Sequence, residues 1–260
     1  MPANAPEQMP QRAGVTRIDI HKEAAMKDFF QYYHRVSDGQ AANWVVAQCT
    51  GPRHSLHTVV PTGFEAYARI EHPYWRVPKP AGPGNSVEQL IAVPCSEVPP
   101  AAKAALYPGC GYAYDGIEPP LEGELSPAAV QSVFAVLGQA STAEQPVYCG
   151  IWEGFGYLRG EQGIAQFAST LGQEYLLFQS TLAEVEQAWQ AAWRESQAAG
   201  FLGVSGFVPN ALWPADRAWY LAVPFQATRS YLAGSQQLVQ ALYSAADLEV
   251  SQAEPLEEFF

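Results

Sequence analysis

Basic side chains are scarce in this chain. Its 260 residues include 14 Lys and Arg against 26 Asp and Glu, which gives a net charge of −12. Nucleic acids and anionic membrane surfaces attract Lys and Arg, so this balance argues against both as partners. The shortage is sharpest in residues 104–260, which hold 4 basic and 17 acidic side chains. That half is interpreted either as solvated acidic loops or as a face that attracts a basic partner protein.

Cysteine is also sparse, and its spacing matches no common ligand pattern. The four cysteines are Cys49, Cys95, Cys110 and Cys149, and no two of them form a C-x-x-C pair. Zinc and haem motifs commonly use such pairs, so the sequence predicts no metal and no cofactor. A disulfide framework is unusual in a chain of this length. Reduced thiols therefore indicate a cytoplasmic protein.

Long apolar runs and standard catalytic motifs are missing too. No segment reaches the ~20 apolar residues of a membrane span, and residues 1–14 lack the apolar core of a signal peptide. The G-x-S-x-G, P-loop and H-E-x-x-H motifs are absent. The glycines Gly154, Gly156 and Gly160 are spaced one residue too far for a dinucleotide fingerprint, so they predict a turn. These absences leave enzyme classes open but support none of them.

The chain does have enough apolar residues for a large core. Hydrophobic residues make up 48% of it and charged residues only 15%, which is typical of a well-packed protein. Helical and strand patterns interleave irregularly, which predicts an α+β fold: a mixed or antiparallel sheet with several amphipathic helices packed on it. We expect a mobile tail at 1–15, a single globular domain at 16–250 with a Pro- and Gly-rich excursion at 73–123, and an acidic tail at 251–260.

Periodicity and capping signals place the elements of that domain. Apolar residues recur at helical spacing from Ala25 to Val36. Ser126 before Pro127 predicts a second helix start, and Thr181 with Glu184 forms a capping box that opens a third. A last helix is expected from Ser235. Strands are predicted at 44–49, 64–71, 147–152, 175–178 and 219–225.

The strand predicted at 64–71 alternates cleanly between its two faces. One face carries Phe64, Ala66, Ala68 and Ile70, and the other carries Glu65, Tyr67, Arg69 and Glu71. Because Glu65 and Arg69 lie four apart on the polar face, they are candidate binding residues. Trp152 and Glu153, at the end of the strand at 147–152, are added to the candidates.

Asp216 and Arg217 form the most distinctive polar pair in the sequence. They stand directly before an apolar strand and between Trp213 and Trp219. One interpretation is structural, with Asp216 accepting backbone N–H bonds in a turn. The other is a recognition edge, because Trp and Arg often supply most of the contact energy at an interface. All four residues are candidate binding residues.

The histidines predict little chemistry. His54 and His57 lie in an expected loop with no acidic neighbour, so no metal site is predicted there. His72 follows the strand at 64–71 and is a candidate partner for Glu65 in proton transfer. The two residues are seven apart, however, and on a regular strand they point to opposite faces.

Three sequence blocks resemble an uncharacterised bacterial protein family. The blocks are Gly63-Phe64-Glu65-Ala66-Tyr67-Ala68-Arg69-Ile70, Gly150-Ile151-Trp152-Glu153-Gly154-Phe155-Gly156 and Leu212-Trp213-Pro214-Ala215-Asp216-Arg217-Ala218-Trp219. The resemblance covers most of residues 42–245, patchily outside these blocks, and implies bacterial origin and a shared fold but no activity. Members carry acidic residues after the Trp-containing strand, where this chain has Pro224, Phe225 and Gln226.

Three functions follow as hypotheses. The favoured one is a non-catalytic binding or protein-interaction module, with a basic or neutral protein partner. The alternative is an enzyme that acts on a small molecule in an aromatic-lined pocket, through Glu65, Arg69, His72, Glu153 and Asp216. The third is binding of a ring-stacking ligand such as a carbohydrate, through Trp75, Trp152 and Trp213.

Overall fold

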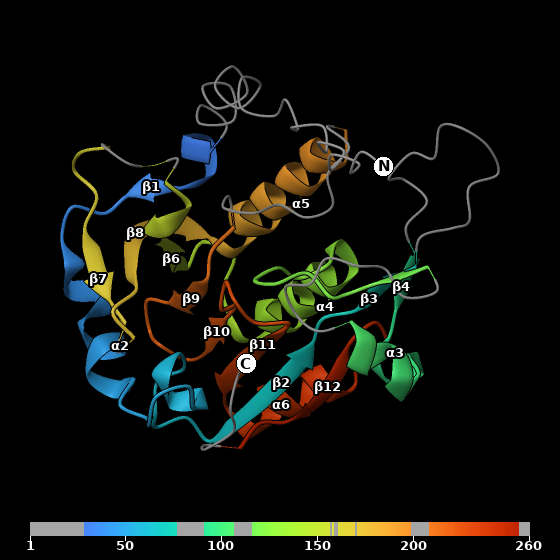
Figure 1. Cartoon of the computed structure of the whole chain (residues 1–260). Helices are drawn as coiled ribbons and strands as arrows, with labels where there is room; N and C mark the ends of the chain where they lie inside the picture. The colour runs from blue at the N-terminus through green and yellow to red at the C-terminus, as the bar shows by residue number, and fades with distance from the viewer. Residues whose placement is uncertain are drawn as a thin grey trace, which may run out of the picture.

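A nine-stranded antiparallel sheet with helices packed on it forms most of the protein (Figure 1). The computed structural model describes residues 29–76, 91–106, 116–156, 158, 161–169, 171–198 and 208–254. The strand order is β1-β8-β6-β9-β10-β11-β2-β12, with β7 paired to β8, and every pair is antiparallel. The predicted α+β class is confirmed. The expected tail at 1–15 and residues 255–260 of the expected acidic tail lie outside the described residues.

The strands of the large sheet are β1 (His34–Arg35), β2 (Ala66–Glu71), β6 (Pro146–Trp152), β7 (Gln166–Ala168), β8 (Glu174–Thr181), β9 (Ala211–Pro214), β10 (Tyr220–Ala222), β11 (Arg229–Gly234) and β12 (Glu249–Gln252). A separate three-stranded sheet consists of β3 (Tyr74–Arg76), β4 (Ile91–Val93) and β5 (Ile117–Glu118). The helices are α2 (Asn43–Gln48), α3 (Pro100–Ala105), α4 (Pro127–Leu137), α5 (Leu182–Ala198) and α6 (Gln236–Tyr243).

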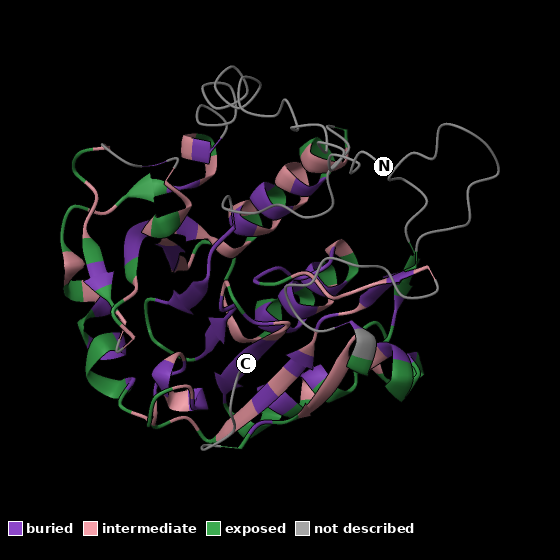
Figure 2. Ribbon diagram, in the orientation of Figure 1, coloured by how far each residue is buried: buried purple, intermediate pink, exposed green. Residues whose placement is uncertain are grey.

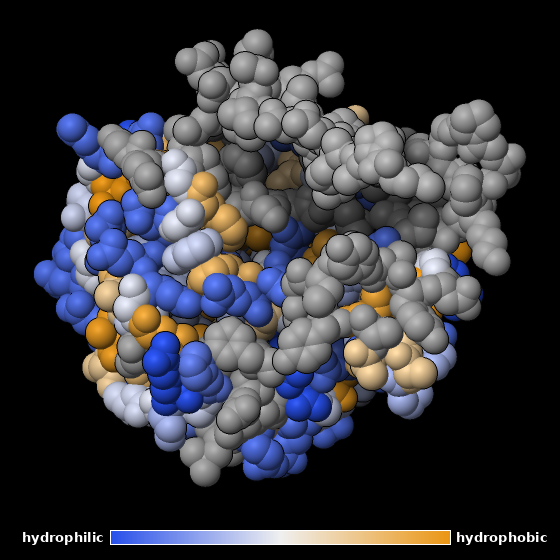
Figure 3. Space-filling view, in the orientation of Figure 1, coloured by the Kyte–Doolittle hydropathy of each residue, from blue (hydrophilic) through white to orange (hydrophobic). Residues whose placement is uncertain are grey.

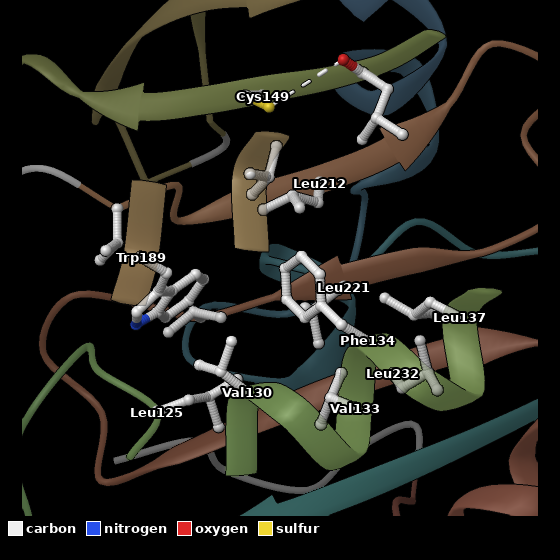
Figure 4. Close-up of a cluster of buried hydrophobic side chains, with 14 of the residues drawn as sticks. Leu125, Val130, Val133, Phe134, Leu137, Cys149, Trp189, Leu212, Leu221 and Leu232 are labelled. Atoms are coloured by element: carbon white, nitrogen blue, oxygen red, sulfur yellow. Dashed lines mark hydrogen bonds between the residues drawn. The ribbon is translucent and has the colours of Figure 1, made fainter. Parts of the chain in front are cut away.

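Helices α4, α5 and α6 cover one side of the large sheet, which we call face one. Its buried residues form a single cluster that includes Ile70, Ile151, Phe178, Leu221 and Leu232 from the strands. Figure 4 shows α4 side chains pointing at Leu212, Leu221 and Leu232. In Figure 2 the buried residues concentrate along the strands and on parts of these helices. Alternation along each strand sends every second side chain into this layer.

The start of each of these helices follows from its capping residues. The Ser126 hydroxyl accepts the Ala129 N–H at 3.2 Å, with Pro127 at the first helical position. The Glu184 carboxylate accepts the Thr181 N–H at 2.9 Å, and the Thr181 hydroxyl accepts the Glu184 N–H at 3.3 Å. The predicted capping box is therefore confirmed. Ser235 caps α6 in the same way.

The opposite side, face two, is covered by aromatic side chains and by the segment at 36–64. Its cluster contains Leu177, Trp213, Tyr220 and Tyr231 from the strands, and Trp44 from α2. The prediction of a strand at 44–49 is wrong, because these residues form helix α2. A short apolar run does not distinguish a strand from a helix. Here the run continues a 3₁₀ helix at 39–42 into α2.

Two further predictions at the N-terminal side need correction. The helix expected as far as Val36 is helical only at 29–32 within the described residues, and Ala25 lies outside them. His34 and Arg35 pair with β8 instead, because the edge of the sheet offers them backbone hydrogen bonds. Phe64 does not share a face with Ile70. It precedes β2 and packs against Trp44 on face two.

The Pro- and Gly-rich excursion contains ordered structure of its own. Strand β3 pairs with β4 on one side and with β5 on the other. A small core of buried residues joins this sheet to α3: Tyr74, Val93, Val98, Ala102, Leu106 and Ile117. Residues 77–90 and 107–115 of the excursion lie outside the described residues.

Strands β8 and β10 differ in extent from the prediction, and strand β12 was not predicted. Strand β8 is longer than 175–178. Strand β10 ends at Ala222, so Phe225 falls in the following turn, where Pro224 has no N–H to donate to a ladder. Trp219 and Leu221 still share face one, as the alternation predicts. Strand β12 lies partly in what was expected to be an acidic tail, and it pairs with β2 along the edge of the sheet.

Candidate functional site

Asp216 and Arg217 lie exposed in the hairpin between β9 and β10. The Asp216 carboxylate accepts the Ala218 N–H at 3.1 Å, which confirms the predicted role of Asp216 in the turn. Arg217 has a left-handed backbone with φ of 61°. Its guanidinium carbon lies 5.3 Å from the centre of the Trp44 ring, within cation–π range. The arginine therefore holds the hairpin over face two.

The two tryptophans beside this pair do not reach the surface. Trp213 is 1% exposed and stacks with Tyr148 and Tyr220 on face two. Trp219 is fully buried on face one, where its indole N–H donates to the Ser141 hydroxyl at 2.9 Å. The expectation that they flank a common recognition edge does not hold, because the two side chains point to opposite faces of the sheet.

Trp152 lies at the other end of β6, where Phe225 and Gly154 lie against its indole. The ring of Phe225 stacks on it with centroids 3.6 Å apart and planes at 8°. Gly154 is also close, because a Cβ atom there would lie 2.1 Å from the indole. Trp75 and Trp213 are buried. A stacking site made of the three tryptophans is therefore not supported.

His72 is buried between β2 and β11 and not near Glu65. Its Nδ1 lies 2.8 Å from the Leu121 carbonyl and its Nε2 lies 2.8 Å from the Ser230 hydroxyl. A carbonyl only accepts, so Nδ1 carries the proton and Nε2 accepts from Ser230. Burial lowers the pKa of His72 to about 4, which keeps the ring neutral. The pair resembles a Ser–His dyad in its hydrogen bonds. Both residues are buried, however, so it fixes the 119–125 loop to the sheet.

The five polar residues of the enzyme hypothesis do not converge. Ala215, next to Asp216, bonds to Pro146 at the start of β6, whereas Glu153 follows its end. The seven residues of that strand separate the two carboxylates by roughly 20 Å. Glu65 lies at the start of β2, where it accepts the Gln236 N–H at 3.1 Å and caps α6. A common pocket for these side chains is excluded by their positions along the strands.

A small cavity lies between α2, β7 and β9, in the described part of the chain. Its volume is about 20 Å³, which holds roughly one water molecule. Cys49 lines it, and burial raises the pKa of that thiol to about 12, so the thiol is not a reactive nucleophile. Ligand pockets in enzymes are hundreds of cubic ångströms in size. The cavity does not accommodate a substrate.

The polar residues that the fold does bring together lie on face two, across β11, β2 and β12. Arg229, Glu71 and Glu249 stand opposite one another in one cross-strand row. Tyr231, Arg69 and Ser251 form the next row. The Arg69 Nε lies 2.7 Å from the Glu71 Oε1, and both side chains are about a quarter exposed. Cross-strand neighbours of this kind interact directly. We call these six residues the polar rows.

Glu249 lies on the edge strand β12 and connects the polar rows to the segment that follows β4 of the small sheet. Its Oε1 accepts the Ser96 N–H at 2.8 Å from the 3₁₀ helix at Cys95–Glu97. Its Oε2 is buried and has no hydrogen-bond partner among the described residues, and the same is true of the Ser251 hydroxyl.

The charge around β12 is negative. The sequence has no Lys or Arg after Arg229, and Asp247, Glu249 and Glu254 accompany the strand. In Figure 3 strongly hydrophilic atoms lie over the part of the surface where β2 and β12 run. Arg229 lies on β11, and Arg69 lies on β2 opposite Ser251. All charged side chains in residues 247–254 are carboxylates.

Sequence reasoning found part of this site and missed the rest. Of the predicted site residues, Arg69 belongs to β2 and lies in the polar rows, and Glu65 directly precedes that strand. Glu249 and Ser251 were not singled out, because β12 was not predicted. The alternation of Val250 with Glu249 and Ser251 is its only sequence signal, and three residues are too few to define a strand.

Comparisons with models of known protein families, with curated proteins and with solved structures give no match. The resemblance of the three sequence blocks to a bacterial family therefore stays a prediction. No helix in the described ranges is long and apolar enough to cross a membrane. Over the same ranges, no three His, Cys, Asp or Glu side chains are grouped in a way that could hold a metal ion.

Proposed function

We propose that the protein is a non-catalytic binding module that recognises a basic partner protein at the β12 edge of the large sheet. The observation that carries the proposal is the Glu249 carboxylate, which lies on β12 in a stretch of the sequence, after Arg229, that has no Lys or Arg. Lys and Arg side chains supply charge-assisted hydrogen bonds to such carboxylates.

The rest of the site supports this reading. The carboxylates at the edge are held by the fold, because Glu249 is fixed by the Ser96 N–H and Glu71 by Arg69. A net charge of −12 would also raise the rate at which a basic partner arrives. The free thiols Cys49, Cys95 and Cys149 suit a reducing compartment, so the cytoplasm is the proposed location.

The test is a titration with two labelled synthetic peptides of equal length, one rich in Lys and one rich in Glu. We expect the Lys-rich peptide alone to bind, with an affinity that falls as salt is added. Glu249→Gln keeps an acceptor for Ser96 but removes the charge, and it should weaken binding about three- to tenfold.

The matched control is Glu174→Gln, at the exposed start of β8 and far across the sheet from β12. It removes one charge from the protein without touching the proposed site, so binding should stay within about a factor of two of wild type. The proposal fails if the Lys-rich peptide does not bind at low salt. It also fails if both variants weaken binding equally.

A further inference from the structure

Among the described residues, strand β12 is the last strand of the large sheet. There it pairs with β2 alone, and no further described strand follows it (Figure 1). The Ala253 N–H donates to the Tyr67 carbonyl at 3.1 Å, which fixes the direction of the backbone groups. Because hydrogen-bonded pairs alternate in an antiparallel ladder, Glu249 and Ser251 bond to β2 while Val250 and Gln252 point outward. Within the described chain, no backbone hydrogen bond from another segment reaches Val250 or Gln252.

This edge lacks most of the features that prevent strand addition. Proteins commonly protect sheet edges with Pro, Lys or a β-bulge. None of these occurs in Glu249–Gln252, although the strand has only four residues. An extended peptide can therefore add to it with the backbone groups of Val250 and Gln252 as partners.

The side chains on either side of the edge indicate what such a peptide carries. Glu249 projects on face two, so a Lys or Arg beside it on the added strand would lie next to a carboxylate. Val250 projects on face one, where α6 packs against β12 and leaves Tyr243 38% exposed. Alternation then predicts basic residues on one face of the peptide and apolar residues on the other.

We infer that β12 binds an extended segment of the partner, with alternating basic and apolar residues, as an additional antiparallel or parallel strand of the large sheet. The inference rests on the proposed function, because it assigns the backbone geometry of that same contact. It differs from simple charge attraction, because the peptide's own amide groups take part in the binding.

The first experiment uses wild-type protein and an alternating Lys-Val peptide with N-methyl groups on every second amide. One version methylates the amides beside the Lys residues and the other those beside the Val residues. Strand addition requires only one of these sets, so we expect one version to bind at least about tenfold more weakly than the other. Equal affinities of the two versions would overturn strand addition while leaving the proposed charge recognition intact. Binding of neither the parent nor the methylated peptides would overturn both.

The second experiment changes the protein at Gln252, whose side chain is exposed and whose N–H points outward. Gln252→Pro removes that donor without removing a bond to β2, because proline is tolerated at an outward position of an edge strand. The matched control is Gln252→Ala. With thermal unfolding of both variants unchanged, the proline variant should bind the parent peptide about tenfold more weakly and the alanine variant should bind normally. Normal binding by the proline variant would contradict the inference.

Discussion

The two faces of the large sheet are built from the same strands but are covered in different ways. Face one carries mainly aliphatic strand side chains, with Phe178 and Trp219 among them, under three amphipathic helices. Face two carries tryptophans and tyrosines under α2 and the irregular segment at 36–64, and it ends at β12 in the polar rows. Regular periodicity builds the first face. The second depends on aromatic contacts between distant segments, and the proposed binding site lies on it.

The largest expected effect tests whether side chains on face two are packed as tightly as those on face one. Leu221 on face one and Leu177 on face two are both fully buried. We expect Leu221→Ala and Leu177→Ala each to lower the free energy of unfolding by about 2–5 kcal/mol, measured by urea denaturation. A cost below ~1 kcal/mol for Leu177→Ala alone would show that the cover over face two is loose. Val46→Ala, at an exposed position of α2, is the control and should cost less than ~0.5 kcal/mol.

A second prediction concerns His72, whose imidazole is buried on face one. The pKa of His72 is about 4 when folded, below its ordinary value of 6.5. The unfolded chain therefore takes up a proton first, and stability falls as the pH drops from 6.5 to 4. The loss attributable to His72 is on the order of 3 kcal/mol. Denaturation curves at pH 7 and pH 4 give the loss of stability for wild type and for His72→Gln. Other titrating groups contribute equally to both proteins, so the loss in wild type should exceed that in the variant by this amount. An equal loss in both proteins would contradict it.

A third prediction separates the two faces by their tryptophans. The indole N–H of Trp219 donates to Ser141, whereas that of Trp213 has no hydrogen-bond partner among the described residues. Replacing each with Phe removes similar volume, but only Trp219→Phe breaks a hydrogen bond. We expect Trp219→Phe to cost about 1–2 kcal/mol more than Trp213→Phe in the same denaturation assay. The reverse order would mean that Trp213 Nε1 is bonded in solution.

The smallest expected effect concerns Arg217 in the hairpin between β9 and β10. Arg217 has a left-handed backbone, which costs a residue with a Cβ about 1 kcal/mol relative to glycine. Arg217→Ala and Arg217→Gly both remove the guanidinium over Trp44, so their difference isolates the backbone. We expect the glycine variant to be more stable than the alanine variant by about 1 kcal/mol in thermal unfolding. At an ordinary helix or strand position, where φ is negative, the alanine variant would instead be the more stable of the two.

The comparison of the faces also explains which predictions succeeded. The stripes of α4, α5 and α6 and their caps at Ser126, Thr181 and Ser235 are local signals, and all were correct. The predictions at 44–49 and at Phe64 failed on face two, because there a short apolar segment takes the conformation that its aromatic neighbours allow. The relevant contacts, such as Trp44 with Trp213 and Tyr220, join residues far apart in the sequence.

The candidate site shows the same division. Arg69 was found from the alternation of a single strand, which is local information. Arg229 and Glu249 become its neighbours only through the register of β11 and β12 against β2. The pairing of two strands that are far apart in the chain depends on the whole sheet, so no spacing rule reveals it.

By itself the sequence determined the α+β class, the helix starts and the alternation of the strands, because hydrogen bonding of caps and the period of a strand act over a few residues. The tertiary structure alone decided the strand order and the cover of face two. It also decided that Trp213 and Trp219 are buried on opposite faces and that β12 is the last described strand of the sheet. These features arise from contacts between distant segments, where packing and shared backbone hydrogen bonds override local preference.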